Sequence, residues 1–213
     1  MTTVLGSRRA SMVASAVALV VSGLLVTLPV VARSAPGPIF SDDFQTGIDL
    51  SRWVLHNPGG GTWIPASEAG NGYVTSPPQS YVLSGDRMDN MMTVRDDFSD
   101  FVMTWDARFQ TESWHADGRP VYFRTDNSNE PLGYWFMTYV THPTYGNRHI
   151  MFFWALRPGG GADNLSELDY PWQLNRWYSF KLKVAGNNFK VKTWLRGDPE
   201  PPGWPMEASD PQS

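Results

Sequence analysis

The clearest pattern in the chain is an alternation of apolar and polar residues over residues 101–109. One face carries Phe101, Met103, Trp105, Ala107 and Phe109, and the other carries Val102, Thr104, Asp106 and Arg108. Successive side chains of a β-strand point to opposite faces of a sheet, so this period of two predicts a strand with its apolar face in a core. Residues 177–184 repeat the pattern, with Tyr178, Phe180, Leu182 and Val184 on the inward face.

Further short apolar or alternating runs are separated by Gly, Pro, Asn and Asp. The predicted strands are residues 81–83, 101–109, 120–125, 134–140, 150–156, 177–184 and 189–195. Ala185-Gly186-Asn187-Asn188 predicts a tight turn, because Gly and Asn tolerate positive φ. Residues 177–195 therefore form a predicted hairpin. No helical period is sustained, and the pattern predicts an all-β fold, a two-sheet antiparallel β-sandwich of jelly-roll type.

The N-terminal segment predicts export. Arg8 and Arg9 precede a run without charges from Ala10 to Ala32, and Ala32-Arg33-Ser34 offers a cleavage site of small residues. Residues 1–34 are thus expected to be a signal peptide. A retained membrane anchor is the alternative, because the run approaches the ~20 residues that span a bilayer. The domain is expected over residues 35–197 of a secreted protein that has no membrane contact after cleavage, followed by a poorly ordered polar, Pro-rich tail over 198–213.

Composition removes several classes of function. The chain has no cysteine, which excludes disulfides, a thiolate nucleophile and cysteine-ligated zinc. Residues 1–34 hold three of the 17 basic residues and none of the 21 acidic ones, which leaves a formal charge of −7 on the remainder. This acidic excess argues against a nucleic-acid partner. The lysines at 181, 183, 190 and 192 are interpreted as a solvated sheet face.

Four sequence blocks resemble the concanavalin A-like lectin/glucanase sandwiches, especially the laminin-G-like and 3-keto-disaccharide-hydrolase-like branches. They are Phe40-Ser-Asp-Asp-Phe44 with Asp49-Leu-Ser-Arg-Trp53, Asp97 to Trp105, Gly118 to Arg124 with Gly133-Tyr-Trp-Phe136, and Asn175 to Val191. The resemblance covers most of residues 39–195 and implies a carbohydrate-binding sandwich. It departs from the family at the C-terminus, where no closing strand is predicted, so that the chain is either truncated or closed differently.

Catalytic signatures are weak. The resemblance implies that a glucanase would carry Glu-x-Asp-x-x-Glu on a strand. Glu167-Leu168-Asp169 begins in this way, but the last position is Trp172 and Pro171 intervenes. We interpret this segment as a loop. No Gly-x-Ser-x-Gly sequence occurs, and His142 and His149, which bracket a short connection, lack an evident third ligand for a metal.

Binding signatures are stronger. Sugar sites combine aromatic faces with planar donors and acids. The outward positions of three central strands supply this mixture, and if the strands are neighbours their side chains form one groove. The predicted carbohydrate-binding residues are Asp106, Arg108, Tyr122, Arg124, Tyr134 and Phe136. Arg124 has a structural alternative, an ion pair with Asp106, and Trp135, Trp154 and Trp177 are assigned to the core.

A structural calcium ion is the one cofactor that the resemblance implies. Asp42 and Asp43 lie where many such sandwiches hold one. Calcium requires six to eight oxygen ligands, which these two residues do not supply alone. The leading hypothesis is a secreted, non-catalytic domain that binds a polysaccharide or glycan. The alternatives are a glycoside hydrolase or lyase of the same fold and a protein-interaction module of laminin-G type.

Overall fold

The computed structural model describes residues 38, 40–56, 63–75, 91–94, 98–110, 121–125, 132–139, 146 and 148–212. The fold described below is that of the unit Asp42–Ser213. The predicted signal peptide and the predicted strand at 81–83 lie outside the described residues. No helix in the described part of the chain has the length and apolar character needed to cross a bilayer.

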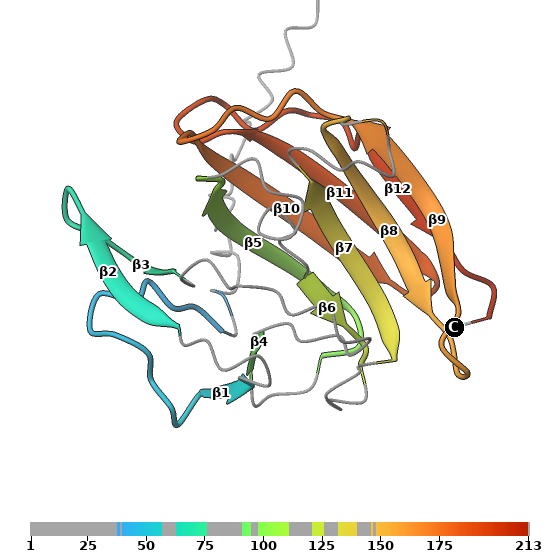
Figure 1. Ribbon diagram of the computed structural model, residues 1–213, viewed down its shortest axis with the longest axis horizontal. Helices are drawn as coiled ribbons and strands as arrows, with labels where there is room; N and C mark the ends of the chain where they lie inside the picture. Colours follow the sequence, from blue (N-terminus) through green and yellow to red (C-terminus); the bar gives the residue numbers. More distant parts are fainter. Residues whose placement is uncertain are drawn as a thin grey trace, which may run out of the picture. The chain divides into compact units, whose positions relative to one another are not determined.

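Twelve strands are described. They are β1 (Trp53–His56), β2 (Ile64–Glu68), β3 (Asn71–Thr75), β4 (Met91–Val94), β5 (Phe101–Arg108), β6 (Val121–Phe123), β7 (Gly133–Tyr139), β8 (Ile150–Leu156), β9 (Ala162–Asp169), β10 (Trp177–Ala185), β11 (Asn188–Leu195) and β12 (Met206–Ser209). Two antiparallel four-stranded sheets contain most of them (Figure 1). The β10 sheet has the order β12-β11-β10-β5, and the β8 sheet has the order β6-β7-β8-β9.

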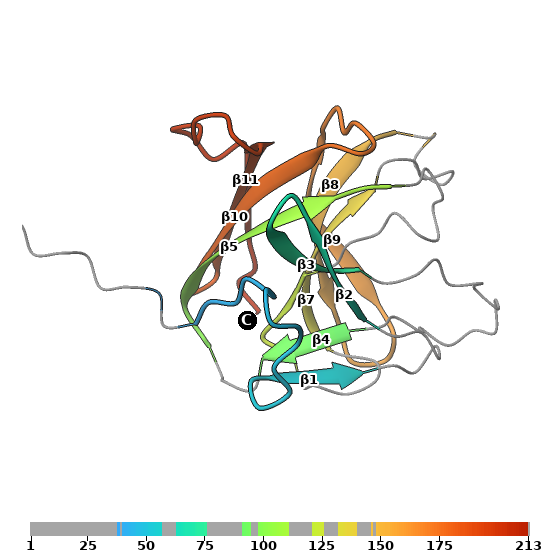
Figure 2. The ribbon, with the colours of Figure 1, turned by 90° about the vertical axis from the view of Figure 1, so that its left-hand side faces the viewer.

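The main core lies between these two sheets, which form two layers in Figure 2. Phe180 of β10 is 1% exposed and its ring stacks on Trp105 of β5 at 4.9 Å between centroids. Trp105 in turn contacts Phe136 of β7, in the facing sheet, at 5.9 Å. Apolar side chains of both inner faces thus interdigitate, as expected of a sandwich. The predicted all-β antiparallel sandwich is confirmed.

The alternation of β5 and β10 correctly predicted their inward faces. Tyr178, Phe180, Leu182 and Val184 are all at most 2% exposed. The hairpin over 177–195 is also confirmed, with Ala185 paired to Asn188 and Gly186 at a φ of +50° in the turn. The two strands that pair with β10 are β5 and β11, and both were predicted from the sequence pattern.

The C-terminal segment corrects a prediction. Residues 198–213 were expected to form a poorly ordered tail without a closing strand, yet β12 pairs with β11 and buries Met206 at 2% exposed. Asp210, also 2% exposed, accepts hydrogen bonds from Tyr134 of β7 and Arg157 at 2.8 Å each. The prediction failed because four residues are too few to show a period, and because a contact between the sheets fixes the segment.

Two smaller antiparallel pairs complete the fold, β1 with β4 and β2 with β3. A Cβ at Gly72 of β3 would lie 2.7 Å from the carbonyl oxygen of Asp43, so only glycine permits this close approach of two backbones. Gln45 donates to the carbonyl of Gly70 in the connecting turn. The β2–β3 hairpin is thus held against residues 43–45.

Candidate functional site

The six predicted carbohydrate-binding residues do not form one groove. Asp106 and Arg108 lie on β5 in the β10 sheet, whereas the other four lie on or beside β6 and β7 in the β8 sheet. The prediction assumed that β5, β6 and β7 are neighbours in one sheet. The chain instead crosses from one sheet to the other between β5 and β6, so its order along the sequence gave no guide to pairing.

Two of the six face the core. Tyr134 and Phe136 of β7 are 6% and 0% exposed and pack against Phe189 of β11 and Phe180 of β10. Trp135, which was assigned to the core, is buried as predicted, but it lies on the opposite face of β7 in a second cluster. Tyr134 and Phe136 were assigned to the wrong face because β7 is apolar on both faces, so alternation does not indicate which face points to the core.

Arg124 has a structural contact, though not the predicted one. It follows β6 with a φ of +51° and pairs with Asp100 at 2.9 Å, not with Asp106. Its Nε also donates to the carbonyl of Ser99. These bonds connect the end of β6 to the segment that precedes β5.

Asp106 and Arg108 take part in attaching the β2–β3 hairpin. Arg108 pairs with Glu68 of β2 at 2.7 Å, and its guanidinium lies 4.9 Å from the centroid of the Trp177 ring. Asp106 pairs with Arg196, which also hydrogen-bonds Asn71 of β3. Both arginines lie near the Trp177 ring and each has a carboxylate partner, so this cluster satisfies its own charges.

The predicted calcium ligands serve other contacts. Asp42 accepts hydrogen bonds from the Phe44 N–H on one oxygen and from the indole N–H of Trp53, at 2.7 Å, on the other. Asp43 accepts from the Gln45 N–H. Among the described residues, no group of three acidic or histidine side chains is placed to hold a metal ion. His142 lies outside the described residues, so the two-histidine pairing stays without a test.

The outer face of the β8 sheet has an unusual composition. A second apolar cluster covers it, here called the aromatic face: Tyr122, Trp135, Met137, Tyr139, Ile150, Phe152, Trp154 and Leu156. Ile150 and Phe152 are fully buried, whereas Tyr122, Tyr139 and Trp154 are partly exposed. The Trp154 ring stacks on Trp135 at 6.3 Å between centroids. Tyr122 is thus the one predicted site residue that this face includes.

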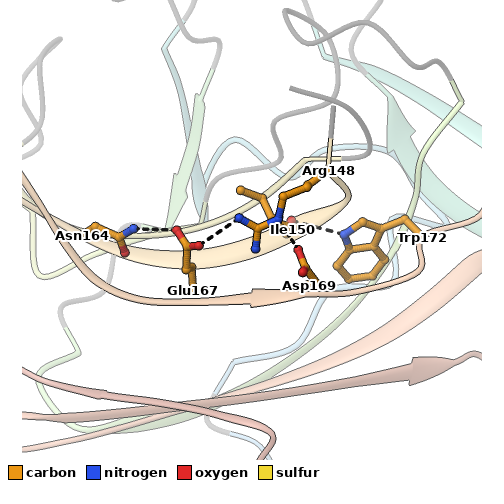
Figure 3. Close-up of polar contacts among 6 residues, drawn as sticks. All are labelled: Arg148, Ile150, Asn164, Glu167, Asp169 and Trp172. Carbon is orange, nitrogen blue, oxygen red and sulfur yellow. Dashed lines mark hydrogen bonds and ion pairs between the residues drawn. The ribbon is translucent and has the colours of Figure 1, made fainter. Parts of the chain in front are cut away.

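Polar side chains of β9 border the aromatic face. Asn164 and Glu167 are paired across strands with Trp154 and Phe152, and Asp169 is paired with Ile150, so all three share the face of those residues. Arg148 donates from Nε to Asp169 at 2.7 Å and from Nη1 to Glu167 at 3.2 Å, and Asn164 donates to Glu167 at 3.0 Å (Figure 3). We call Arg148, Asn164, Glu167 and Asp169 the β9 rim.

The β9 rim corrects the interpretation of residues 167–169 as a loop. They end an eight-residue strand whose ladder has a bulge between Phe153 and Trp154. The bulge separates the two inward leucines, Leu165 and Leu168, by three positions instead of two, which hides the strand period. The sequence signal that could have indicated this strand is the pair of carboxylates Glu167 and Asp169, which are two positions apart.

The chemistry of the rim is that of recognition by ionised groups. The hydrogen bond to Asp169, with that to Glu167, raises the pKa of Arg148, which is therefore cationic at all ordinary pH values. Both carboxylates contact this cation. The third position of the glucanase-like pattern, Trp172, is 3% exposed in the main core, where its indole donates to the carbonyl of Ile150 (Figure 3). The described rim therefore offers acceptors, one cation and an aromatic neighbour, and the glucanase-like pattern lacks its second glutamate.

Trp154 adds a donor at this border. Its ring is partly exposed, but its indole N–H is buried and has no hydrogen-bond acceptor among the described residues. A buried donor without a partner costs free energy.

Comparisons with known proteins give one likeness. No family model matches the chain, and no curated protein matches it. A solved structure of a carbohydrate-binding module, CBM66 of Bacillus subtilis, is similar with 17% sequence identity and a TM-score of 0.44, over 74% of this chain and 79% of that one. At this identity and score the likeness carries no argument about function, which rests on the site geometry.

Proposed function

We propose that this protein is a non-catalytic carbohydrate-binding β-sandwich that binds a polysaccharide or glycan at the border between Trp154 and the β9 rim. The observation that carries the proposal is the placement of a partly exposed tryptophan beside a mixed row of amide, carboxylate and guanidinium groups on one sheet face. Aromatic rings stack on the C–H faces of sugars, and planar polar groups fix the orientation of hydroxyls. The sequence blocks that resemble concanavalin A-like sandwiches support the same class.

The proposal places the protein outside the cytoplasm. Its support is the sequence of residues 1–34, in which two arginines precede a long apolar run and a cleavage site of small residues. An extracellular polysaccharide is then the accessible partner.

A hydrolase of the same fold is the less favoured function. Retaining and inverting glycosidases need one protonated carboxylic acid beside a second carboxylate. Here Arg148 contacts both Glu167 and Asp169, and Trp172, which lies in the main core, stands where the glucanase-like pattern has its second glutamate. If the protein releases reducing sugar from a polysaccharide and Glu167→Gln abolishes this release, the hydrolase is favoured instead.

The test is a binding measurement with matched variants on the two sheets. The purified protein is applied to an array of plant, fungal and bacterial polysaccharides, and the strongest ligand is titrated by calorimetry. Trp154→Ala and Arg148→Ala are each expected to weaken binding at least about tenfold, the loss of a contact of about 1.4 kcal/mol. Trp177→Ala and Arg196→Ala are the controls, because they remove the same residue types from the self-paired cluster on the other sheet.

The controls are expected to change affinity less than about twofold, a difference well under 1 kcal/mol. Circular dichroism confirms that each variant is folded. An equal loss in the control pair would place the site on the β10 sheet. A folded protein that binds no polysaccharide, with unchanged behaviour of all four variants, would refute carbohydrate binding.

A further inference from the structure

The β2–β3 hairpin is held differently from the strands of the two large sheets. Its backbone pairs β2 only with β3, and Figure 1 shows the two strands outside both four-stranded sheets. Every residue of the two strands is at least partly exposed, and none belongs to either apolar cluster of the described chain. An isolated two-stranded hairpin is marginally stable in water, so this one depends on contacts with its neighbours.

Glu68 at the end of β2 makes the charged contact between the hairpin and the β10 sheet. Its carboxylate pairs with Arg108 of β5 at 2.7 Å and accepts a hydrogen bond from the indole N–H of Trp177 at 3.4 Å. Among the described residues, Glu68 is the only carboxylate that pairs with Arg108. The Glu68 side chain is 51% exposed, so water and salt weaken the attraction.

Two further contacts join β3 to the same sheet. Asn71 accepts a hydrogen bond from Arg196 at 2.9 Å, and Tyr73 meets the ring of Trp177 edge-on with centroids 5.6 Å apart. Arg196 has a second partner within its own sheet, because Asp106 pairs with it at 3.0 Å. Detachment of the hairpin would leave this arginine paired, so its contact with β3 opposes detachment less than the ion pair on β2 does.

The attachment of the hairpin to residues 43–45 is of another kind. A Cβ at Gly72 would lie 2.7 Å from the carbonyl oxygen of Asp43, and the side-chain amide of Gln45 donates to the carbonyl of Gly70 at 2.9 Å. These contacts depend on close backbone packing and on an uncharged hydrogen bond, which salt screens little. The hairpin therefore has one attachment that is insensitive to salt and one that depends on charge.

We infer that residues 64–75 form a flap, which separates from the β10 sheet as a unit while the sandwich stays folded and while its contact with residues 43–45 persists. The ion pair of Glu68 with Arg108 controls how often the flap opens. In the open state Trp177 loses its contacts with the hairpin, so the flap controls the exposure of this ring. The flap lies on the β10 sheet and is independent of the proposed carbohydrate site on the β8 sheet.

Hydrogen–deuterium exchange measured by mass spectrometry tests the flap in the whole protein. Peptides from residues 64–75 are expected to exchange faster than those from residues 177–195, because opening does not require the sandwich to unfold. Glu68→Gln is expected to raise the exchange rate of residues 64–75 about two- to fivefold, the range for an exposed ion pair, and to leave residues 177–195 unchanged. Salt is expected to speed the exchange of residues 64–75 in the unmodified protein but not in this variant.

Glu207→Gln is the matched control. Glu207 pairs with Lys190 at 2.6 Å and its side chain is 51% exposed, as that of Glu68 is, but this ion pair joins β12 to β11 within the β10 sheet. The control is expected to leave the exchange of residues 64–75 unchanged.

Spin labels measure the separation itself. The chain has no cysteine, so Ser67→Cys on β2 and Lys183→Cys on β10, both at exposed positions, provide one pair of labelling sites. At low salt the labelled protein is expected to show one main distance between the labels. Addition of Glu68→Gln, or of high salt, is expected to add a second, longer distance.

Three results would overturn the inference. The first is an exchange rate of residues 64–75 that neither Glu68→Gln nor salt changes. The second is an equal increase in Glu207→Gln, because the loss of any ion pair of the β10 sheet would then have the same effect. The third is a single label distance under all conditions, which would show that the hairpin exchanges without leaving the sheet.

Discussion

The outer faces of the two sheets differ in composition: one carries charged side chains held in ion pairs, and the other carries buried aromatic side chains. The outer face of the β10 sheet is charged, with lysines directly opposite one another on β10 and β11: Lys181 faces Lys192, and Lys183 faces Lys190. The outer face of the β8 sheet is aromatic, with Phe152 and Ile150 fully buried and the charged side chains of the β9 rim along its border. Three of the four lysines on one face have ion-pair partners, and the other face is a second core.

The charged face depends on two glutamates. Like charges opposite one another destabilise a sheet. Glu200 contacts both Lys181 and Lys192, at 2.9 and 2.6 Å, and Glu207 contacts Lys190 at 2.6 Å. Lys192 is also covered by Trp204, whose ring centroid lies 4.8 Å from Nζ. Lysines that are paired in this way have little left for a ligand, whereas the β9 rim borders the partly exposed ring of Trp154.

The largest expected effect tests whether the aromatic face behaves as a core. Phe152→Ala is expected to lower the free energy of unfolding by about 3–5 kcal/mol, because a large buried ring is removed and leaves a cavity. Lys181→Ala, on the outer face of the other sheet, is expected to cost less than about 1 kcal/mol. Urea unfolding of the two variants makes the comparison. A cost for Phe152→Ala as small as that for Lys181→Ala would contradict the description of this face as a second core.

The next effect concerns the contact between the sheets at Asp210. Burial disfavours its ionised form, but hydrogen bonds from Arg157, from the Gln212 N–H and from Tyr134 outweigh this and hold the pKa of Asp210 below its ordinary value of 3.8. The stabilisation is therefore complete above pH 3.8 and is lost as the pH falls through the lower pKa of the folded state.

Asp210→Asn is expected to cost about 3 kcal/mol at neutral pH, the lower end of the range for breaking a buried ion pair, because Arg157 is partly exposed. Its loss of stability below pH 3.8 should be smaller than that of the unmodified protein. Denaturant unfolding at a series of pH values measures both. Equal acid sensitivity of the two proteins would show that the acid transition does not depend on Asp210.

The smallest effect concerns the bridging glutamate. The hydrogen bonds from Lys192 and Lys181 lower the pKa of Glu200 from its ordinary value of 4.5, so its contribution is present above that pH and fades as the carboxylate is protonated. Glu200→Gln is expected to lower the melting temperature by less than Asp210→Asn does. High salt should reduce the difference from the unmodified protein. If the decrease in melting temperature is independent of salt, the packing of residues 198–205 and not the charge of Glu200 is responsible for it.

Much of the fold was predictable and little of the site was. Residues 150–156 and 177–195 were assigned correctly because their composition and period are local properties. Strand β9 was missed because its bulge hides the period, and β12 because it is short. Asp106 and Arg108 were correctly placed on an outward strand face, but their partners, Glu68 and Arg196, are distant in sequence.

The sequence by itself determined that this is an all-β chain with its inward face on β5 and β10, since alternation acts within one strand. It also contains the apolar N-terminal run on which the proposed location outside the cytoplasm rests. Only the tertiary structure decided which face of β7 is the core and which side chains border Trp154. Both depend on the register between strands and on the packing of one sheet against the other, which are contacts between distant residues that no local pattern contains.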